Sequence, residues 1–212
     1  ATDPNCVAVV VTIEGAHAFG VGNFTIKKGE VPDLRQKLSE NIKLVKSWDA
    51  PPVFTNLSHH FNNRLAGHAR SLKVPVNGMF NQKTEMGTGI TELGWHVLEE
   101  MLSAENGRRM LVDVKHMSLK SRLEYYEFEE RHNRINPTYK IPVICSHTGV
   151  NGLESMNHSR KTGSRNKKNG EVFNNWTINL SDEEIRFIHN SGGMIGIIMD
   201  KHMLASKQRL DY

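Results

Sequence analysis

Two short apolar segments that each lead to a histidine constrain this chain most strongly. Residues 110–114 are followed by His116, and residues 141–145 are followed by His147. Apolar runs of this length are typical of buried strands in parallel sheets. Polar residues at the carboxyl ends of such strands lie where α/β folds build active sites. Because neutral imidazole is a common metal ligand, two neighbouring strands that both end in histidine could hold one metal ion between them.

The remainder of the chain alternates between apolar runs and segments with apolar residues at helical spacing. Strands are expected at residues 6–13, 52–57, 110–114, 141–145 and 194–199, with 6–13 as a central strand. Helices are expected at residues 32–46, 91–102, 118–131 and in the segment that begins at Ser181. Long irregular stretches interrupt this order at residues 62–89 and 149–177.

Polar residues and glycines mark several helix ends. Thr91 is expected to cap the second helix, and Gly107 is expected to end it. Ser181 is followed three residues later by Glu184, a spacing typical of a capping box. These signals support the predicted helices independently of their apolar spacing.

Strands that alternate with helices predict an α/β fold with a parallel sheet and right-handed crossovers. Such a sheet is either open and doubly wound or part of a (β/α)8 barrel. No G-x-G-x-x-G follows a strand and no P-loop is present, so no motif indicates nucleotide binding. A typical barrel needs about 250 residues, and this chain has 212. Counting alone therefore favours an open sheet or an incomplete barrel.

The composition argues against several classes of protein. The net charge of +4 is modest and much of the excess lies at residues 160–168, so we expect no nucleic-acid partner. No run of about 18 apolar residues is present, so no transmembrane segment is expected. Cys6 and Cys145 both lie in apolar runs and are expected to be buried free thiols. The cellular location stays open.

Four polar side chains fall at the carboxyl ends of predicted strands: Glu14, His59, His116 and His147. In a parallel sheet these ends lie on one side, so the four side chains are expected to meet. A carboxylate and two imidazoles suit zinc or a similar divalent metal. A carboxylate can also bridge two metal ions, and a further group such as His59 can polarise a carbonyl or hold an oxyanion.

Each of these residues also has an ordinary structural explanation, because the chain contains 11 histidines. Their position at successive strand ends is what favours a site. Asp113 could orient a ligand histidine or be a core carboxylate. A carbamylated Lys115 would be another bridging ligand. We do not assign it this role, because Glu14 fills it. The other histidines are expected to be structural or solvent-facing: His17, His60, His68, His96, His132, His158, His189 and His202.

Several short pieces of the chain carry a resemblance to a known family. They are Ile13-Glu14-Gly15, Leu57-Ser58-His59, Gly89-Ile90-Thr91-Glu92-Leu93-Gly94, Leu111-Val112-Asp113-Val114-Lys115-His116-Met117-Ser118, Pro142-Val143-Ile144-Cys145-Ser146-His147, and Asn179-Leu180-Ser181-Asp182-Glu183 leading into Gly192-Gly193-Met194-Ile195-Gly196. In this order, over nearly the whole chain, they resemble the membrane (renal-type) dipeptidases, which are zinc enzymes of the amidohydrolase-like barrel class.

The resemblance implies a fold, a substrate class and a set of roles. It implies a (β/α)8 barrel and a dipeptide or related small amide as substrate. Glu14 would bridge two zinc ions, and His116 and His147 would complete the second zinc site. His59 would contact the scissile carbonyl and steady the tetrahedral intermediate that forms when a metal-bridging hydroxide attacks the amide.

The chain departs from that family at three places. Family members carry a His-x-Asp pair on the first strand and an aspartate on the last strand, and this chain supplies neither. They also carry an arginine for the substrate carboxylate where this chain has Ile178, behind the basic segment that contains Arg160 and Arg165. The chain is therefore expected to be one partial barrel domain, residues 1–212, that covers about strands three to seven and retains one of two zinc sites.

Two other interpretations stay open. The chain could be a non-catalytic or binding homologue whose basic loop contacts an acidic partner. It could also be an open α/β sheet with scattered histidines, which predicts no metal and a large separation between His116 and His147. An incomplete barrel would expose strand edges, which invite association, so a homo-oligomer belongs to the same prediction.

Overall fold

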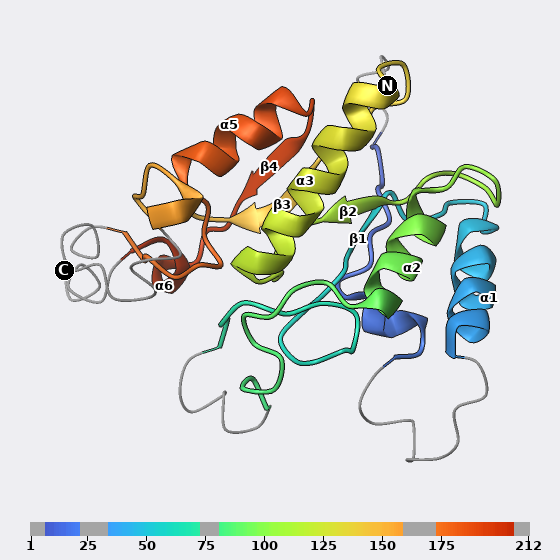
Figure 1. Cartoon of the computed structure of the whole chain (residues 1–212), viewed down its shortest axis with the longest axis horizontal. Coiled ribbons are helices and arrows are strands. Elements are labelled where there is room, and N and C mark those ends of the chain that lie inside the picture. Colours follow the sequence, from blue (N-terminus) through green and yellow to red (C-terminus); the bar gives the residue numbers. More distant parts are fainter. Residues whose placement is uncertain (1–6, 22–33, 73–80, 159–172, 206–212) are drawn as a thin grey trace.

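Four parallel strands form one sheet in the computed structural model, which describes residues 7–21, 34–72, 81–158 and 173–205 (Figure 1). The strands are β1 (Phe54–Asn56), β2 (Leu111–Asp113), β3 (Ile144–Thr148) and β4 (Met194–Ile197). They are hydrogen-bonded in chain order, and each neighbouring pair is parallel. The predicted α/β fold with a parallel sheet is therefore confirmed, while the barrel stays a prediction.

Helical segments precede, separate and follow the four strands along the chain. They are η1 (Ala16–Phe19), α1 (Leu34–Lys46), α2 (Glu92–Leu102), α3 (Leu119–Ile135), α5 (Asp182–Asn190) and α6 (Lys201–Leu204). In Figure 1 α3 crosses the sheet near β2 and β3, and α1 packs beside α2. The sequence predicts neither η1 nor α6, because a segment of four residues is too short to show a helical period.

The first two α-helices form where apolar spacing and caps predict them. α1 buries Leu38, Ile42 and Val45, whose spacing of four and then three residues places them on one face. α2 begins after Thr91, whose hydroxyl accepts a hydrogen bond from the backbone N–H of Gly94 at 3.0 Å. This bond satisfies one of the free donors at the helix N-terminus.

α2 ends at Leu102, as the predicted range 91–102 gives, but the residue that caps this end is Ser103 and not Gly107. The Nζ atom of Lys46 donates to the backbone carbonyls of Glu100 at 3.0 Å and Ser103 at 2.6 Å. These contacts satisfy carbonyl groups that a longer helix would bond internally. Gly107 instead forms a turn before β2, with a φ of +111° that favours glycine.

The predicted central strand at residues 6–13 is wrong in the part that the structure describes. Ile13 makes an isolated parallel bridge to Thr55, and the residues before it form no strand ladder. Val7 and Val9 are largely exposed, so the segment lies along the edge of the described sheet beside β1. β-Branched residues favour extended backbone, but a central position requires pairing on both sides.

β3 runs from Ile144 to Thr148, so it begins and ends three residues later than predicted. His147 therefore lies within the strand rather than after it. The backbone N–H of Ile141 donates to the side chain of Asn133 on α3 at 2.7 Å. A helix side chain therefore takes a donor that a longer strand would use in its ladder. β1 and β4 are likewise shorter than the predicted apolar runs.

β4 approaches β3 closely at two glycines. A Cβ atom on Gly193 would lie 1.9 Å from the carbonyl oxygen of Val143, and one on Gly196 would lie 1.8 Å from that of Ser146. Any larger residue would force the two strands apart. These glycines therefore allow the backbone of β4 to support β3 next to His147.

The strands and helices enclose one main apolar core. Its buried members include Leu98 and Met101 of α2, Val112 of β2 and Cys145 of β3. Burial raises the pKa of the Cys145 thiol to about 12, and the thiol is free, as predicted. Cys6 lies outside the described residues. None of the helices in the described ranges combines the length and apolar character needed to cross a membrane.

Candidate metal centre

Glu14 lies between three histidines that come from different segments of the sheet. Its Oε1 atom is 3.3 Å from Nε2 of His59, 3.2 Å from Nε2 of His116 and 3.3 Å from Nε2 of His147. The structure therefore brings together the four side chains selected from the sequence. The interpretation with scattered histidines is wrong on this point, because the ring centroids of His116 and His147 are 5.2 Å apart.

Gly15 gives the chain the turn that presents Glu14 to the histidines. Its φ is +108°, and a Cβ atom there would lie 2.4 Å from the imidazole ring of His17. The hydrogen bond from His116 lowers the pKa of Glu14 to about 2, against the opposing effect of partial burial. Glu14 is therefore a carboxylate anion throughout the physiological pH range.

His116 occupies a strained turn immediately after β2. Its φ of +69° lies in the left-handed region, which costs a residue with a large side chain roughly 1–2 kcal/mol. The turn is held by the bond from the N–H of Met117 to the carbonyl of Val114 at 3.2 Å, and by the bond from the N–H of Ala69 to the carbonyl of His116 at 2.8 Å. Such strain is found most often at functional sites.

Burial favours the neutral form of the histidines in this cluster. It lowers the pKa of His116 to about 3 and that of His60 to about 4. It also lowers the pKa values of His59 and His147 below that of a free imidazole. A neutral imidazole has a lone pair on one ring nitrogen, so these rings can act as metal ligands near pH 7.

Asp113 links the two segments that carry His116 and His147. Its Oδ1 accepts hydrogen bonds from the backbone N–H groups of Lys115 and Ser146, both at 3.0 Å. One predicted role of Asp113 was to orient a ligand histidine by direct contact. The structure shows its Oδ1 bonded to backbone groups instead. It positions the backbone immediately before each histidine, while the hydroxyl of Ser146 lies 2.7 Å from Nδ1 of His147.

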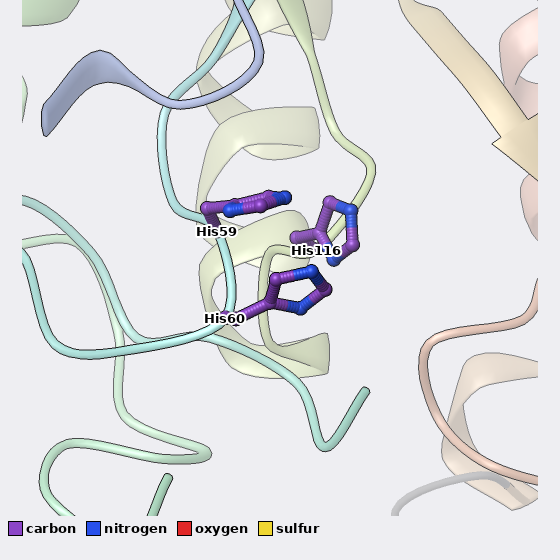
Figure 2. A group of neighbouring side chains, drawn as sticks. All are labelled: His59, His60 and His116. Carbon is purple, nitrogen blue, oxygen red and sulfur yellow. The ribbon is translucent and has the colours of Figure 1, made fainter. Parts of the chain in front are cut away.

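The structure places two further histidines in the cluster. The ring centroid of His60 is 3.8 Å from that of His59 and 4.7 Å from that of His116 (Figure 2). His17 stacks on His59 with ring centroids 6.0 Å apart. Both histidines were expected to be structural or solvent-facing, and the structure places their rings beside the candidate ligands. The sequence signals were the adjacency of His60 to His59 and the short distance from Glu14 to His17.

The remaining histidines lie outside the cluster, in agreement with their prediction. His68 is buried and its Nε2 lies 3.1 Å from the carbonyl oxygen of Gln82. Nε2 of His96 lies 2.9 Å from the hydroxyl of Ser39 on α1. The others are half-buried or exposed on the described surface: His132, His158, His189 and His202.

Lys115 is buried directly beside the cluster. Within the described part of the chain, its Nζ atom has no hydrogen-bond partner, and burial lowers its pKa to about 8. Its backbone carbonyl accepts a hydrogen bond from the side chain of Asn56 at 3.2 Å. Glu14 and not Lys115 occupies the position between the three histidine nitrogens.

Ile178 stands where the resemblance to the dipeptidases implies an arginine for the substrate carboxylate. Ile178 is buried against Ala69 and Met203. Its side chain is a hydrocarbon and offers no charge to a ligand. Arg160 and Arg165 lie outside the described residues, as does the basic segment that was expected to contact an acidic partner. Arg70 and Ala69 line a cavity of about 710 Å³, and the guanidinium of Arg70 lies 4.8 Å from the ring centroid of Trp176.

Comparison with known proteins identifies no family for this chain. No family model matches it. It is similar to a Klebsiella pneumoniae protein described as "Uncharacterized protein in pqqA 5'region", with 22% identity over 196 residues. The match covers 92% of this chain and 52% of the relative, so the chain spans about half the length of the curated relative it matches.

Proposed function

We propose that this chain is part of a metal-dependent hydrolase that cleaves the amide bond of a dipeptide or a related small amide. The observation that carries the proposal is the convergence of three imidazole nitrogens, each within 3.3 Å, on one carboxylate oxygen of Glu14. These side chains come from positions as far apart as residues 14 and 147.

The donor set fits a zinc ion. The ligand atoms of Glu14, His116 and His147 all lie within 4.8 Å of one another. A carboxylate and two imidazoles are ligands that zinc takes in catalytic sites, where a further position stays open. A zinc ion bound by these residues would supply a Lewis acid and lower the pKa of water toward about 7.

His59 is proposed to contact the substrate. Its Nε2 faces the same carboxylate oxygen, but Glu14, His116 and His147 already supply three ligands. A neutral imidazole can donate one N–H, and here that donor would hold the oxyanion that develops as the amide carbonyl is attacked. Partial burial of the ring limits competition from water for that hydrogen bond.

The strand order supports a partial (β/α)8 barrel. A doubly wound sheet reverses its strand order at a switch point, whereas β1 to β4 follow one another without reversal. Right-handed crossovers in a single direction place all helices on one face, as they do in a barrel. The edge segment that ends at Ile13 and the four strands would then correspond to about strands three to seven.

Arg70 is proposed as the group that receives the carboxylate of a dipeptide. It follows Ala69, whose N–H bonds to the backbone of His116, so its backbone is tied to the metal centre. The ring of Trp176 holds the guanidinium by a cation–π contact without neutralising its charge. Because the chain spans about half of its curated relative, the amide-cleaving activity is proposed for the complete protein.

The metal centre is tested by measuring zinc binding of the purified chain by calorimetry and elemental analysis. We expect about one zinc ion per chain, loss of binding in His116→Ala, and an affinity lowered by about 10- to 100-fold or more in His147→Ala. His96→Ala is the matched control, because His96 is also bonded to a serine but lies outside the cluster. Unchanged zinc affinity in both His116→Ala and His147→Ala would overturn the proposal.

A further inference from the structure

A second group of three histidines overlaps the proposed centre. The ligand atoms of His59, His60 and His116 all lie within 4.8 Å of one another. Their ring centroids are 3.8 Å apart for His59 and His60, 4.5 Å for His59 and His116, and 4.7 Å for His60 and His116. Figure 2 shows the three rings gathered around a common space, with His59 and His60 on one segment and His116 on another.

The ring of His60 has the same kind of hydrogen-bond partner as the ring of His147, a ligand of the proposed centre. Its Nδ1 lies 2.7 Å from the hydroxyl of Ser71, and Nδ1 of His147 likewise lies 2.7 Å from the hydroxyl of Ser146. Metal-binding histidines commonly donate the N–H of the second ring nitrogen to such a partner. If Nδ1 of His60 donates to Ser71, its Nε2 is left with a lone pair for a metal.

The serine that contacts His60 is itself fixed. The side-chain amide of Gln82 donates to the hydroxyl of Ser71 at 2.9 Å and to the backbone carbonyl of His60 at 2.8 Å. Gln82 is buried, so this arrangement is part of the packed structure. The ring of His60 is thus held by a small network of its own, which the proposed hydrolase chemistry does not use.

We propose that His59, His60 and His116 form a second position for the zinc ion. This inference rests on the proposed metal centre and adds His59 and His60 as ligands of the ion when it occupies the second position. Three imidazoles with one open position are a known ligand set of catalytic zinc. Nitrogens around a tetrahedral zinc are about 3.4 Å apart, so small rotations of rings already within 4.8 Å of one another suffice.

Because His116 belongs to both ligand sets, the chain holds one ion at a time. The position that includes Glu14 has a carboxylate, which offsets part of the charge of the cation. The three-histidine position has no carboxylate. The ion therefore resides mainly at Glu14, His116 and His147. Removal of His147 weakens that position and leaves the three-histidine position to bind the ion.

The test is a double-variant cycle in which zinc affinity is measured by competition with a chromophoric chelator. We expect His60→Ala to stay within about threefold of wild type and His147→Ala to bind about one ion roughly 10- to 100-fold more weakly. The double variant His60→Ala/His147→Ala should lose a further tenfold or more. Cobalt(II) bound to His147→Ala should show an absorption spectrum that changes when His60 is also replaced.

The control variant is His96→Ala/His147→Ala, which should match His147→Ala alone. Equal affinities of His147→Ala and the His60→Ala/His147→Ala variant, with identical cobalt spectra, would overturn the second position. If Glu14, His116 and His147 do not bind the ion, the result differs, because His147→Ala then binds zinc as tightly as wild type. Circular dichroism in chelator establishes that each variant is folded, and His60→Asn serves as a second replacement that keeps a polar side chain.

Discussion

Glu129 is a carboxyl group that the fold buries on α3. Its side chain accepts a hydrogen bond from Asn133. Burial raises its pKa to about 7, the charge of Glu130 adds to this shift, and Lys140 opposes it. The folded chain therefore keeps Glu129 protonated at pH values where the unfolded chain has already released the proton.

The contribution of Glu129 to stability is expected to fall as pH rises. The group contributes fully below its unfolded pKa of about 4.5, and the contribution is lost between about pH 4.5 and 7. Glu129→Gln removes this loss, so we expect it to raise the free energy of unfolding at pH 8 by about 2 kcal/mol. Urea unfolding of both chains from pH 4.5 to 8, in chelator, measures the difference.

Glu127→Gln is the control for this prediction, since Glu127 is exposed on the same helix. Its difference from wild type should be small and should not change across the same pH range. A Glu129→Gln variant whose stability difference is also independent of pH would contradict the prediction.

At the scale of elements, a buried ion pair joins α3 to α5. Nε of Arg122 donates to Oε1 of Glu184 at 2.6 Å, and both side chains are almost completely buried. The guanidinium also donates to the backbone carbonyls of Met117 at 2.9 Å and Thr177 at 2.7 Å. Oε2 of Glu184 accepts from Ser181 in the capping box, so one carboxylate caps the N-terminus of α5 and anchors α3.

Breaking this pair should be far more costly than breaking a surface pair. Arg122→Met leaves a buried carboxylate without its cation, and we expect a loss of about 3–5 kcal/mol in the free energy of unfolding. Arg122→Met/Glu184→Gln should recover part of that loss, because the unpaired charge is gone. Arg134→Met removes an exposed pair with Glu130 and should change stability by less than about 1 kcal/mol. Urea unfolding of these variants gives the comparison, and equal losses for the two single variants would contradict it.

At the scale of the whole molecule, both edges of the described sheet carry exposed apolar side chains. Ile197 on β4 is 73% exposed, and Val7 and Val9 beside β1 are also open to solvent. Unpaired strand edges with apolar side chains are templates for pairing with another chain.

The predicted homo-oligomer follows from these edges. We expect the isolated chain to associate in a concentration-dependent manner in sedimentation velocity. Ile197→Lys places a charge on the edge strand and should shift the distribution toward monomer. Ile135→Lys is the control, because Ile135 is 70% exposed but lies at the end of α3 rather than on a strand. A wild-type chain that stays monomeric at all concentrations would contradict the prediction.

Local patterns in the sequence determined the order of strands and helices and several helix caps. Thr91 and Ser181 cap their helices because the donor and acceptor lie three residues apart in the chain. The convergence of Glu14 and His116 was also predictable, because carboxyl ends of parallel strands share one side of a sheet. A short stretch of residues carries the physical cause of the caps, and the parallel order of the strands carries that of the convergence.

Tertiary structure decided what depends on neighbours distant in the chain. His60 joins the histidine cluster because Ser71 and Gln82 hold its ring, and no local period predicts that contact. The start of β3 depends on a bond to α3, and Arg122 finds its carboxylate 62 residues away. Burial lowers the pKa of His60, and burial exists only once the segments have packed together.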